Sequence, residues 1–394
     1  MGTSKFDGPD QSASYKIARE LAKNNLVYYI DYPYTIKDFF KLRSSDQTKR
    51  RLPFFSPFAD GIITTEETDL KVVILPLLLS INFLPEGKLY RLLLKINEGL
   101  IVKRLKRLLR RHDILDYLYI NSFNFHYPGV ADKLKPRLEV YHCVDPMIMA
   151  YDKKHGIISE AELVKKSDLV ICTSRQLYKE KRIENSNTYF IPNAADIKHS
   201  QKALLPETKI HQSLANIPRP IIGYTGTIER RIDYELLKKV VENNKDKSFV
   251  FAGTLNMAYV PEWFMKASNI FLTGRFAFEE MPEIIKGFDI AIIPFKKDAV
   301  SGTIFPLKLF EYLGSGKPVI ATNFNPDISE FTEGTVKFCD SAEDFCRLID
   351  SILGKDTPEE MQKRIGVAEN NTWEKRGIEF SELLSHVLQK QIFL

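Results

Sequence analysis

Residues 289–322 contain three patterned runs in succession: DIAIIP (289–294), PLKLFEYLG (306–314) and PVIAT (318–322). The two outer runs are short and apolar, as in strands that are buried on both faces of a sheet. The middle run has the apolar spacing of a helix. A strand, a helix and a second strand in this order form the repeating unit of a parallel sheet. The stretch therefore predicts an α/β fold.

The same alternation extends from this stretch toward both ends of the chain. In the second half, strands are expected at 220–224, 248–252 and 270–273, and helices at 233–241 and 281–286. In the first half, strands are expected at 26–31, 71–79, 114–120, 137–144 and 168–173, and helices at 13–23, 88–111 and 159–166. Two such series predict two doubly wound, Rossmann-like domains. Ligands of such sheets bind where the strands end, so we expect the domains to face each other across a cleft.

The length of the chain agrees with two domains, because 394 residues exceed a single core at about 150 residues per domain. We expect an N-terminal domain at 1–200, a polar linker at 201–219 and a C-terminal domain at 220–370. A last helix at 371–394 is expected to pack back on the N-terminal domain.

The beginning of the chain has the character of a loop. Residues 1–9, MGTSKFDGP, look like the connection that follows a first strand. Two interpretations stay open: a strand precedes them in the natural protein, or the sheet begins with the run at 26–31.

The composition is that of a globular protein, with 44% hydrophobic and 27% charged residues. The four cysteines form no CxxC pair and have no histidines at zinc spacing, which favours a reduced, cytoplasmic protein without a metal. The most apolar stretch, 72–84, is interrupted by Pro76, Ser80 and Asn82 and is shorter than a spanning helix. No cleavable signal is visible at the N-terminus.

Positive charge is concentrated in the segment 88–111. It holds nine lysines and arginines and one acidic residue, Glu98, while the whole chain has a formal net charge of +5. The cations alternate with leucines and isoleucines. Such a helix can lie on the anionic inner face of a plasma membrane, or it can cover a sheet while its cations extend to water. No nucleic-acid-binding motif accompanies the charge, so nucleic acid is not expected as a partner.

Several segments of the second half together resemble the retaining family-4 glycosyltransferases, especially those of bacterial polysaccharide synthesis. They are IPNAAD (191–196), IGYTGTI (222–228), DYELL (233–237), FEEMP (278–282), FDIAIIPF (288–295) and PLKLFEYLGSGKPVI (306–320). The first half matches more loosely, through VYHCVD (140–145) and DLVICTS (168–174). The resemblance implies the GT-B fold and transfer of a sugar from a nucleotide-sugar donor to a glycan, lipid-linked or other acceptor.

The resemblance also implies a donor site in the second domain. A diphosphate is bound by backbone N–H groups at a helix N-terminus together with cations. Pro306 stands in the first turn of the expected helix, Glu311 would accept hydrogen bonds from the ribose hydroxyls, and Thr303 replaces a glutamate that relatives place at the donor sugar. The complete set of donor-binding candidates is Gly226, Thr227, Ser301, Gly302, Thr303, Leu307, Lys308 and Glu311.

Catalytic candidates come from both domains. Arg230 or Arg231 would neutralise the charge that develops on the leaving diphosphate. Asp145 ends a strand where many relatives place a histidine, and His126 follows the preceding strand. His142 is expected to pack inside the sheet.

Retaining transfer of this kind needs no protein nucleophile, and no Asp-x-Asp metal motif is present. Catalysis is therefore expected to depend on positioning and charge stabilisation, without a cofactor or metal. Two alternatives remain: a GT-B nucleotide-sugar epimerase, and a non-catalytic scaffold that binds a nucleotide-sugar.

Overall fold

The structure is a computed structural model that describes residues 1–8, 12–298 and 300–392. The chain divides into two compact units. The first comprises Met1–Pro192 together with Gly377–Leu394, and the second comprises Asn193–Arg376. The segment 201–219, expected to be a linker, belongs to the second unit and holds two 3-10 helices, η2 (Gln201–Leu204) and η3 (Gln212–Leu214).

The first unit contains two sheets. The three-stranded sheet has the order β1-β3-β2, formed by β1 (Val27–Ile30), β2 (Ile62–Thr64) and β3 (Leu70–Val73). The four-stranded sheet follows chain order, with β4 (Leu118–Ser122), β5 (Leu138–Cys143), β6 (Leu169–Cys172) and β7 (Thr188–Phe190). All pairs are parallel except β2 with β3. The strand expected at 71–79 ends at Val73, ahead of Pro76, which has no N–H for a sheet ladder.

Met1 and Gly2 lie between the two sheets. The Gly2 amide donates to the Ile30 carbonyl of β1 at 3.3 Å, and Gly2 forms a parallel bridge with Ser122 of β4. The start of the chain is thus paired with a strand on each side. Of the residues that resemble a loop after a first strand, Pro9 lies outside the described residues.

The helices of the first unit are α1 (Ala13–Ala22), α2 (Ile36–Leu42), α3 (Asp46–Arg51), α4 (Lys88–Arg111), α5 (Val130–Leu134), α6 (Ala150–Lys166), α7 (Arg175–Glu184) and the part of α16 (Trp373–Ile392) from Gly377 onward. They include those expected at 13–23, 88–111 and 371–394, while the one expected at 159–166 begins earlier, at Ala150, and α2, α3, α5 and α7 were not expected. Polar caps begin several of these helices; the Ser12 side chain, for example, accepts a hydrogen bond from the Tyr15 amide at the start of α1.

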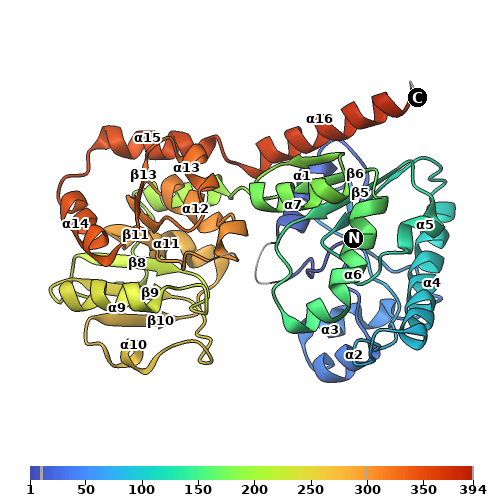
Figure 1. The fold of residues 1–394 in the computed structure, drawn as a ribbon, viewed down its shortest axis with the longest axis horizontal. Coiled ribbons are helices and arrows are strands. Elements are labelled where there is room, and N and C mark those ends of the chain that lie inside the picture. Colours follow the sequence, from blue (N-terminus) through green and yellow to red (C-terminus); the bar gives the residue numbers. More distant parts are fainter. Residues whose placement is uncertain (9–11, 299, 393–394) are drawn as a thin grey trace. The chain divides into compact units, whose positions relative to one another are not determined.

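The second unit is built on one six-stranded parallel sheet of the order β10-β9-β8-β11-β12-β13 (Figure 1). Its strands are β8 (Ile221–Thr225), β9 (Ser248–Ala252), β10 (Ile270–Gly274), β11 (Ile290–Ile293), β12 (Val319–Thr322) and β13 (Val336–Cys339). Every residue of β8, β9, β11 and β12 is buried, as the unbroken apolar runs predict.

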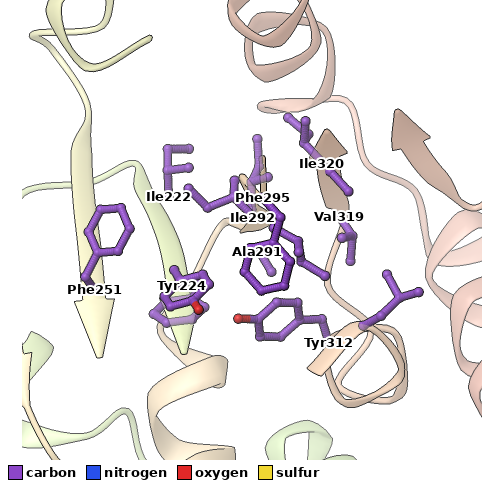
Figure 2. Packing of buried hydrophobic residues seen from close by; sticks show 14 of the residues in the cluster. Ile222, Tyr224, Phe251, Ala291, Ile292, Phe295, Tyr312, Val319 and Ile320 are labelled. Carbon is purple, nitrogen blue, oxygen red and sulfur yellow. The ribbon is translucent and has the colours of Figure 1, made fainter. Parts of the chain in front are cut away.

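Helices surround this sheet and bury it on both faces. They are α8 (Ile197–Ser200), α9 (Tyr234–Asn243), α10 (Glu262–Lys266), α11 (Met281–Lys286), α12 (Leu307–Gly314), α13 (Asp327–Thr332), α14 (Ala342–Ile352) and α15 (Pro358–Glu369). The core contains Tyr224, Phe295 and Tyr312, which lie near the strand ends (Figure 2). Across the described part of the chain, no helix is both long and apolar enough to cross a membrane.

Candidate active site

Strand β8 ends in a turn at Gly226. The φ of Gly226 is 116°, a conformation that glycine adopts without strain and other residues do not. A Cβ atom at this position would lie 2.7 Å from the Lys308 Nζ. Glycine therefore lets the end of β8 pass directly beside the lysine ammonium.

Lys308 is the best-defined cation of the site. Its Nζ donates a hydrogen bond of 2.7 Å to the Tyr224 hydroxyl and lies 3.9 Å from the centroid of the same ring. The centroid of Phe295 is 5.3 Å away. Burial of the ammonium lowers the pKa of Lys308 to about 7, and the positive charge of Arg231 contributes in the same direction. An anion bound here would favour the charged form of Lys308 and raise its pKa again.

The two arginine candidates differ in their surroundings. Arg231 pairs with Glu229, and its guanidinium lies 5.5 Å from the centroid of Phe295, the ring that also faces Lys308. Arg230 is half-buried, and Thr227 is exposed, with its carbonyl accepting from the Tyr224 hydroxyl at 3.1 Å. The structure thus brings Arg231, rather than Arg230, to the aromatic group around Lys308.

Glu311 lies one turn after Lys308 on α12 and is half-buried. Its negative charge acts against the lowering of the Lys308 pKa, so the two charges interact. The next residue, Tyr312, accepts a hydrogen bond of 2.7 Å from the Thr225 amide. This bond ties α12 to the end of β8 and fixes the helix beside Gly226.

The segment before α12 holds three of the donor-binding candidates, Ser301, Gly302 and Thr303. Thr303 is buried, and its hydroxyl donates to the Val300 carbonyl at 2.6 Å. Ser301 is buried too, and its amide donates to Asp298 at 2.7 Å. Thr303 thus uses its proton within its own turn, η5 (Ser301–Thr303), which also contains the half-buried Gly302.

Helix α12 starts one residue later than expected. Pro306 is its N-cap residue, with φ −77° and ψ 121°, instead of standing in the first turn. The first helical residues are Leu307 and Lys308, whose amides are among the four that an α-helix leaves without intrahelical partners. The free amides at the positive end of α12 and the side chain of Lys308 therefore belong to the same helical turn.

The candidates of the first unit follow adjacent parallel strands. His126 comes after β4 and Asp145 after β5, so both stand at the carboxyl edge of the same sheet. The His126 Nε2 lies 3.6 Å from an Asp152 carboxylate oxygen, and burial lowers the pKa of His126. Asp145 is exposed.

His142 is a packing residue, as expected. It is buried in β5, its Nδ1 lies 2.9 Å from the Ser122 hydroxyl, and burial lowers its pKa to about 4. The imidazole is therefore neutral at ordinary pH.

Three aromatic residues of the site were not foreseen from the sequence. Tyr224 and Phe295 enclose the Lys308 ammonium, and Tyr312 positions α12. A signal was available, because Tyr224 and Phe295 stand where two expected strands end. Within the described residues, no group of three or more His, Cys, Asp and Glu side chains is placed to hold a metal ion.

Comparison with known sequences locates a family domain in the second unit. Residues 219–355 match the family described as glycosyl transferases group 1. The chain is also 26% identical over 259 residues to the putative teichuronic acid biosynthesis glycosyltransferase TuaH of Bacillus subtilis. That match covers 59% of this chain and 63% of the Bacillus protein, so less than two thirds of the relative is represented.

Comparison with solved structures extends over nearly the whole chain. Sucrose-phosphate synthase from Thermosynechococcus elongatus superposes with a TM-score of 0.65 at 14% identity, covering 98% of each chain. Anabaena HepE in complex with UDP and glucose superposes with a TM-score of 0.62 at 13% identity, covering 96% of this chain and 97% of that one. At such identities the likeness concerns the fold, and it confirms the predicted GT-B class.

Proposed function

Since the chain has the GT-B fold and carries a glycosyl transferases group 1 domain at residues 219–355, we propose that it transfers a sugar from a nucleotide-sugar to an acceptor hydroxyl. The observation that carries this proposal is the position of Lys308. Its ammonium lies beside Gly226 at the end of β8 and in the first turn of α12. A diphosphate placed there would meet a cation, helix amides and a backbone without a side chain in the way.

The donor would be bound in three parts. The diphosphate would face Lys308, the leading amides of α12 and Arg231. Glu311, one turn further along α12, would accept hydrogen bonds from the ribose hydroxyls, which a carboxylate can do with both oxygens. HepE, which shares the fold, was solved with UDP, so UDP is the first nucleotide to test.

The chemistry we propose is stabilisation of the leaving group. When the bond between the sugar and the diphosphate breaks, negative charge grows on the phosphate oxygen. Lys308 and Arg231 would stabilise that charge from fixed positions, since Tyr224 and Phe295 hold the Lys308 ammonium and Glu229 holds Arg231. Retention of configuration and independence from a metal are parts of this proposal.

The surroundings of Thr303 bear on the non-catalytic alternative. Because its hydroxyl is buried and donates to Val300, this residue offers the sugar no carboxylate. A charge-assisted contact to the sugar would then come from other groups, or the protein would bind the nucleotide without transfer. Slow release of free sugar from the donor would distinguish a transferase from a scaffold, because a scaffold does not hydrolyse its ligand.

We further propose that helix α4 places the acceptor side of the protein on an anionic membrane. Leu89 and Leu92 have 59% and 57% of their surfaces exposed, and Ile96 has 45% exposed. They lie three and four residues apart on one face of α4, and exposed lysines at 88, 95, 103 and 106 flank them. Apolar side chains bordered by lysines suit the interface of a bilayer with anionic headgroups. A lipid-linked acceptor would be reached from this position.

Three arginines of α4 take little part in this surface. Arg104 is buried and donates to the carbonyls of Phe54, Ser56 and Ala59, at 3.2, 2.6 and 2.9 Å. Arg107 bonds to the Pro57 carbonyl, and Arg111 pairs with Asp60. These side chains hold the segment 54–60 against the helix, so the membrane face consists of the leucines and lysines.

The test of the proposed function is donor hydrolysis without an acceptor. The purified protein is incubated with UDP-, GDP- and dTDP-sugars in excess EDTA, and free sugar is measured against a Lys308→Met variant. Release that depends on Lys308 and persists in EDTA supports the proposal. Binding of the nucleotide without any release favours the scaffold, and release that requires added magnesium or manganese contradicts metal independence.

A further inference from the structure

A loop that follows the 3-10 helix η1 (Leu52–Phe54) presents a phenylalanine to solvent. Phe58 has 86% of its surface exposed, more than any other phenylalanine that the structure describes. An apolar side chain stabilises a fold only where it leaves water, so this ring contributes little to stability. The main chain around it is nevertheless firmly held.

The arginines of α4 fix the main chain on both sides of Phe58. Arg104 and Arg107 donate hydrogen bonds to the carbonyls of four residues: Phe54, Ser56, Pro57 and Ala59. The end of the loop is fixed as well, because the Gly61 carbonyl accepts from the Ile74 amide at 2.6 Å. The φ of Gly61 is 74°, and a Cβ atom there would collide with the Arg104 guanidinium. The loop is therefore built closely around this arginine.

The main-chain donors at the tip of the loop are also used or absent. Pro57 has no N–H group. The Phe58 amide donates to the Ser56 hydroxyl at 3.3 Å, and the Ala59 amide donates to the Ser56 carbonyl at 3.1 Å. With the carbonyls that the arginines bind, most polar main-chain groups of residues 57–59 have a partner within the protein. A backbone that enters lipid needs this, because lipid offers no hydrogen-bonding partners.

The loop lies beside the face of α4 that carries exposed leucines. Arg107, which binds the Pro57 carbonyl, follows Leu89 by 18 residues on the same helix. At 3.6 residues per turn, 18 residues make five complete turns, so both side chains point to the same side of α4. Phe58 is thus placed near this face, about 27 Å further along the helix than Leu89.

We propose that Phe58 is a membrane anchor whose ring enters the interface of an anionic bilayer, with α4 lying parallel to the membrane between this anchor and the exposed leucines. The proposal rests on the membrane placement of α4 given above. Lys103 and Lys106, which are exposed between the two apolar ends, face the anionic headgroups. Two apolar contacts far apart on one helix limit the tilt of the first unit on the membrane, which the leucines alone do not.

A bilayer fits this loop better than a pocket in a partner protein does. A partner protein can supply hydrogen bonds to the main chain around an inserted ring, whereas lipid cannot. The bonds from Arg104 and Arg107 to the carbonyls of the loop meet the requirement of lipid. The exposed lysines of α4 add attraction to anionic headgroups.

The test places a tryptophan at the proposed anchor. Phe58→Trp is mixed with vesicles of phosphatidylserine and phosphatidylcholine, and with the same vesicles carrying bromine on their acyl chains, which quenches nearby tryptophan. Leu115→Trp is the matched control, because Leu115 is exposed in the same unit outside α4. The unsubstituted protein supplies the background from Trp263 and Trp373.

We expect the emission of Phe58→Trp to move to shorter wavelength on the vesicles and to be quenched by bromine several-fold more than that of Leu115→Trp. Phe58→Ser should weaken vesicle binding by about 5- to 10-fold, as expected for partial burial of one phenyl ring. Its melting temperature should stay unchanged, because the exposed ring contributes little to the fold.

A second pair of variants tests the arginine-bound carbonyls. Arg107→Gln and Arg110→Gln each remove one positive charge from α4, but Arg107 binds Pro57 whereas Arg110 donates to the Lys106 carbonyl of its own helix. In the Phe58→Trp protein, Arg107→Gln should reduce quenching by bromine more than Arg110→Gln does, because the Pro57 carbonyl would enter lipid without a partner. Equal effects would show that charge alone matters and would overturn the argument from the loop.

Failure of the anchor can be distinguished from failure of the membrane placement. If the unsubstituted protein does not co-sediment with the vesicles, both proposals are wrong. If it co-sediments but the tryptophan of Phe58→Trp is neither shifted nor quenched, α4 binds through its leucines and lysines and Phe58 is no anchor. If the emission shifts without vesicles as the protein concentration rises, Phe58 contacts a second copy of the chain, which also refutes the anchor.

Discussion

The ammonium of Lys308 is held by Tyr224, which accepts its hydrogen bond at 2.7 Å and presents its ring 3.9 Å from the same nitrogen. Lys308 stands at the start of α12 and Tyr224 near the end of β8, so this contact joins the helix to the sheet. The hydrogen bond also holds the Lys308 ammonium beside Gly226, at the end of β8. The predictions about the donor begin from this pair.

Lys308→Met should weaken UDP binding about 10- to 100-fold, as expected for the loss of a charge-assisted hydrogen bond. Methionine keeps the length and the aromatic contacts of the side chain but carries no charge. Isothermal titration calorimetry measures the change. Lys239→Met, on an exposed position of α9, is the matched control and should bind as the wild type does. Equal affinity of the two variants would remove Lys308 from the donor site.

UDP binding should take up a proton above pH 7. The pKa of Lys308 is lowered to about 7 in the free protein, and a bound diphosphate raises it. Affinity should therefore fall as the pH rises from 7 to 9, and calorimetry in buffers of different ionisation enthalpy should show the uptake. Lys308→Met should lose this dependence; a dependence that survives in the variant belongs to another group.

The lowered pKa of Lys308 also affects the stability of the fold, which should rise with pH, whereas the affinity for UDP should fall. Between pH 7 and 10.5 the unfolded chain keeps the Lys308 proton and the folded chain does not, so this residue makes stability rise with pH in that window. The free energy of unfolding of the wild type should rise relative to Lys308→Met across the window. Urea titrations at pH 6.5 and 9.5 measure this, and a constant difference between the two proteins would contradict it.

Glu311→Ala should weaken UDP binding by about 2–3 kcal/mol and leave pyrophosphate binding almost unchanged. The carboxylate is assigned to the ribose, which pyrophosphate lacks. Lys308→Met should weaken both ligands, so the two variants separate the ribose contact from the phosphate contact. Loss of both ligands in Glu311→Ala would show that this residue acts through Lys308, whose pKa it influences.

The double variant Leu89→Ser and Leu92→Ser should reduce co-sedimentation with phosphatidylserine vesicles several-fold. Both residues are exposed on α4 and would enter the bilayer interface. Leu115→Ser is the matched control, because Leu115 has 94% of its surface exposed in the same unit but lies beyond the helix. Binding should also fall as salt rises. Equal loss in both variants, or no binding by the wild type, would argue against α4 as a membrane face.

Arg104→Gln should destabilise the first unit by about 2–4 kcal/mol, because it removes the donors that satisfy three carbonyls of the segment 54–60. Arg110→Gln, at an exposed position of the same helix, should be nearly neutral. Thermal unfolding compares the two. If Arg110→Gln abolishes vesicle binding at unchanged stability, Arg110 contributes to the membrane-binding surface, and that surface does not consist of leucines and lysines alone.

The parallel sheets could be predicted because their strands are unbroken apolar runs. The predicted helix at 88–111 has the observed bounds of α4, since its apolar spacing is regular from end to end. The strands that were missed are short or only partly buried. The residues of β2, for example, are half-buried or exposed, so its sequence carries no strong apolar signal.

The aromatic contacts of the site depend on which strands are neighbours in the sheet, and a single sequence does not reveal strand order. Tyr224 and Phe295 are far apart along the chain and meet because β8 and β11 are neighbours in the sheet. Strand order is a property of the whole fold. Arg104, in contrast, could have been recognised: its spacing from Ile101 and Leu108 places it on the buried face of α4.

The return of Gly377–Leu394 to the first unit has a consequence for synthesis on the ribosome. The second unit is one continuous piece of chain, and it can fold as soon as it emerges. The first unit waits for α16, whose Leu384 and Leu388 form part of its apolar interior. At 5–20 residues per second, roughly 10 to 40 s pass between the synthesis of Pro192 and that of α16. During this interval the growing chain carries an incomplete, apolar N-terminal half, which makes it a client for chaperones that bind nascent polypeptides.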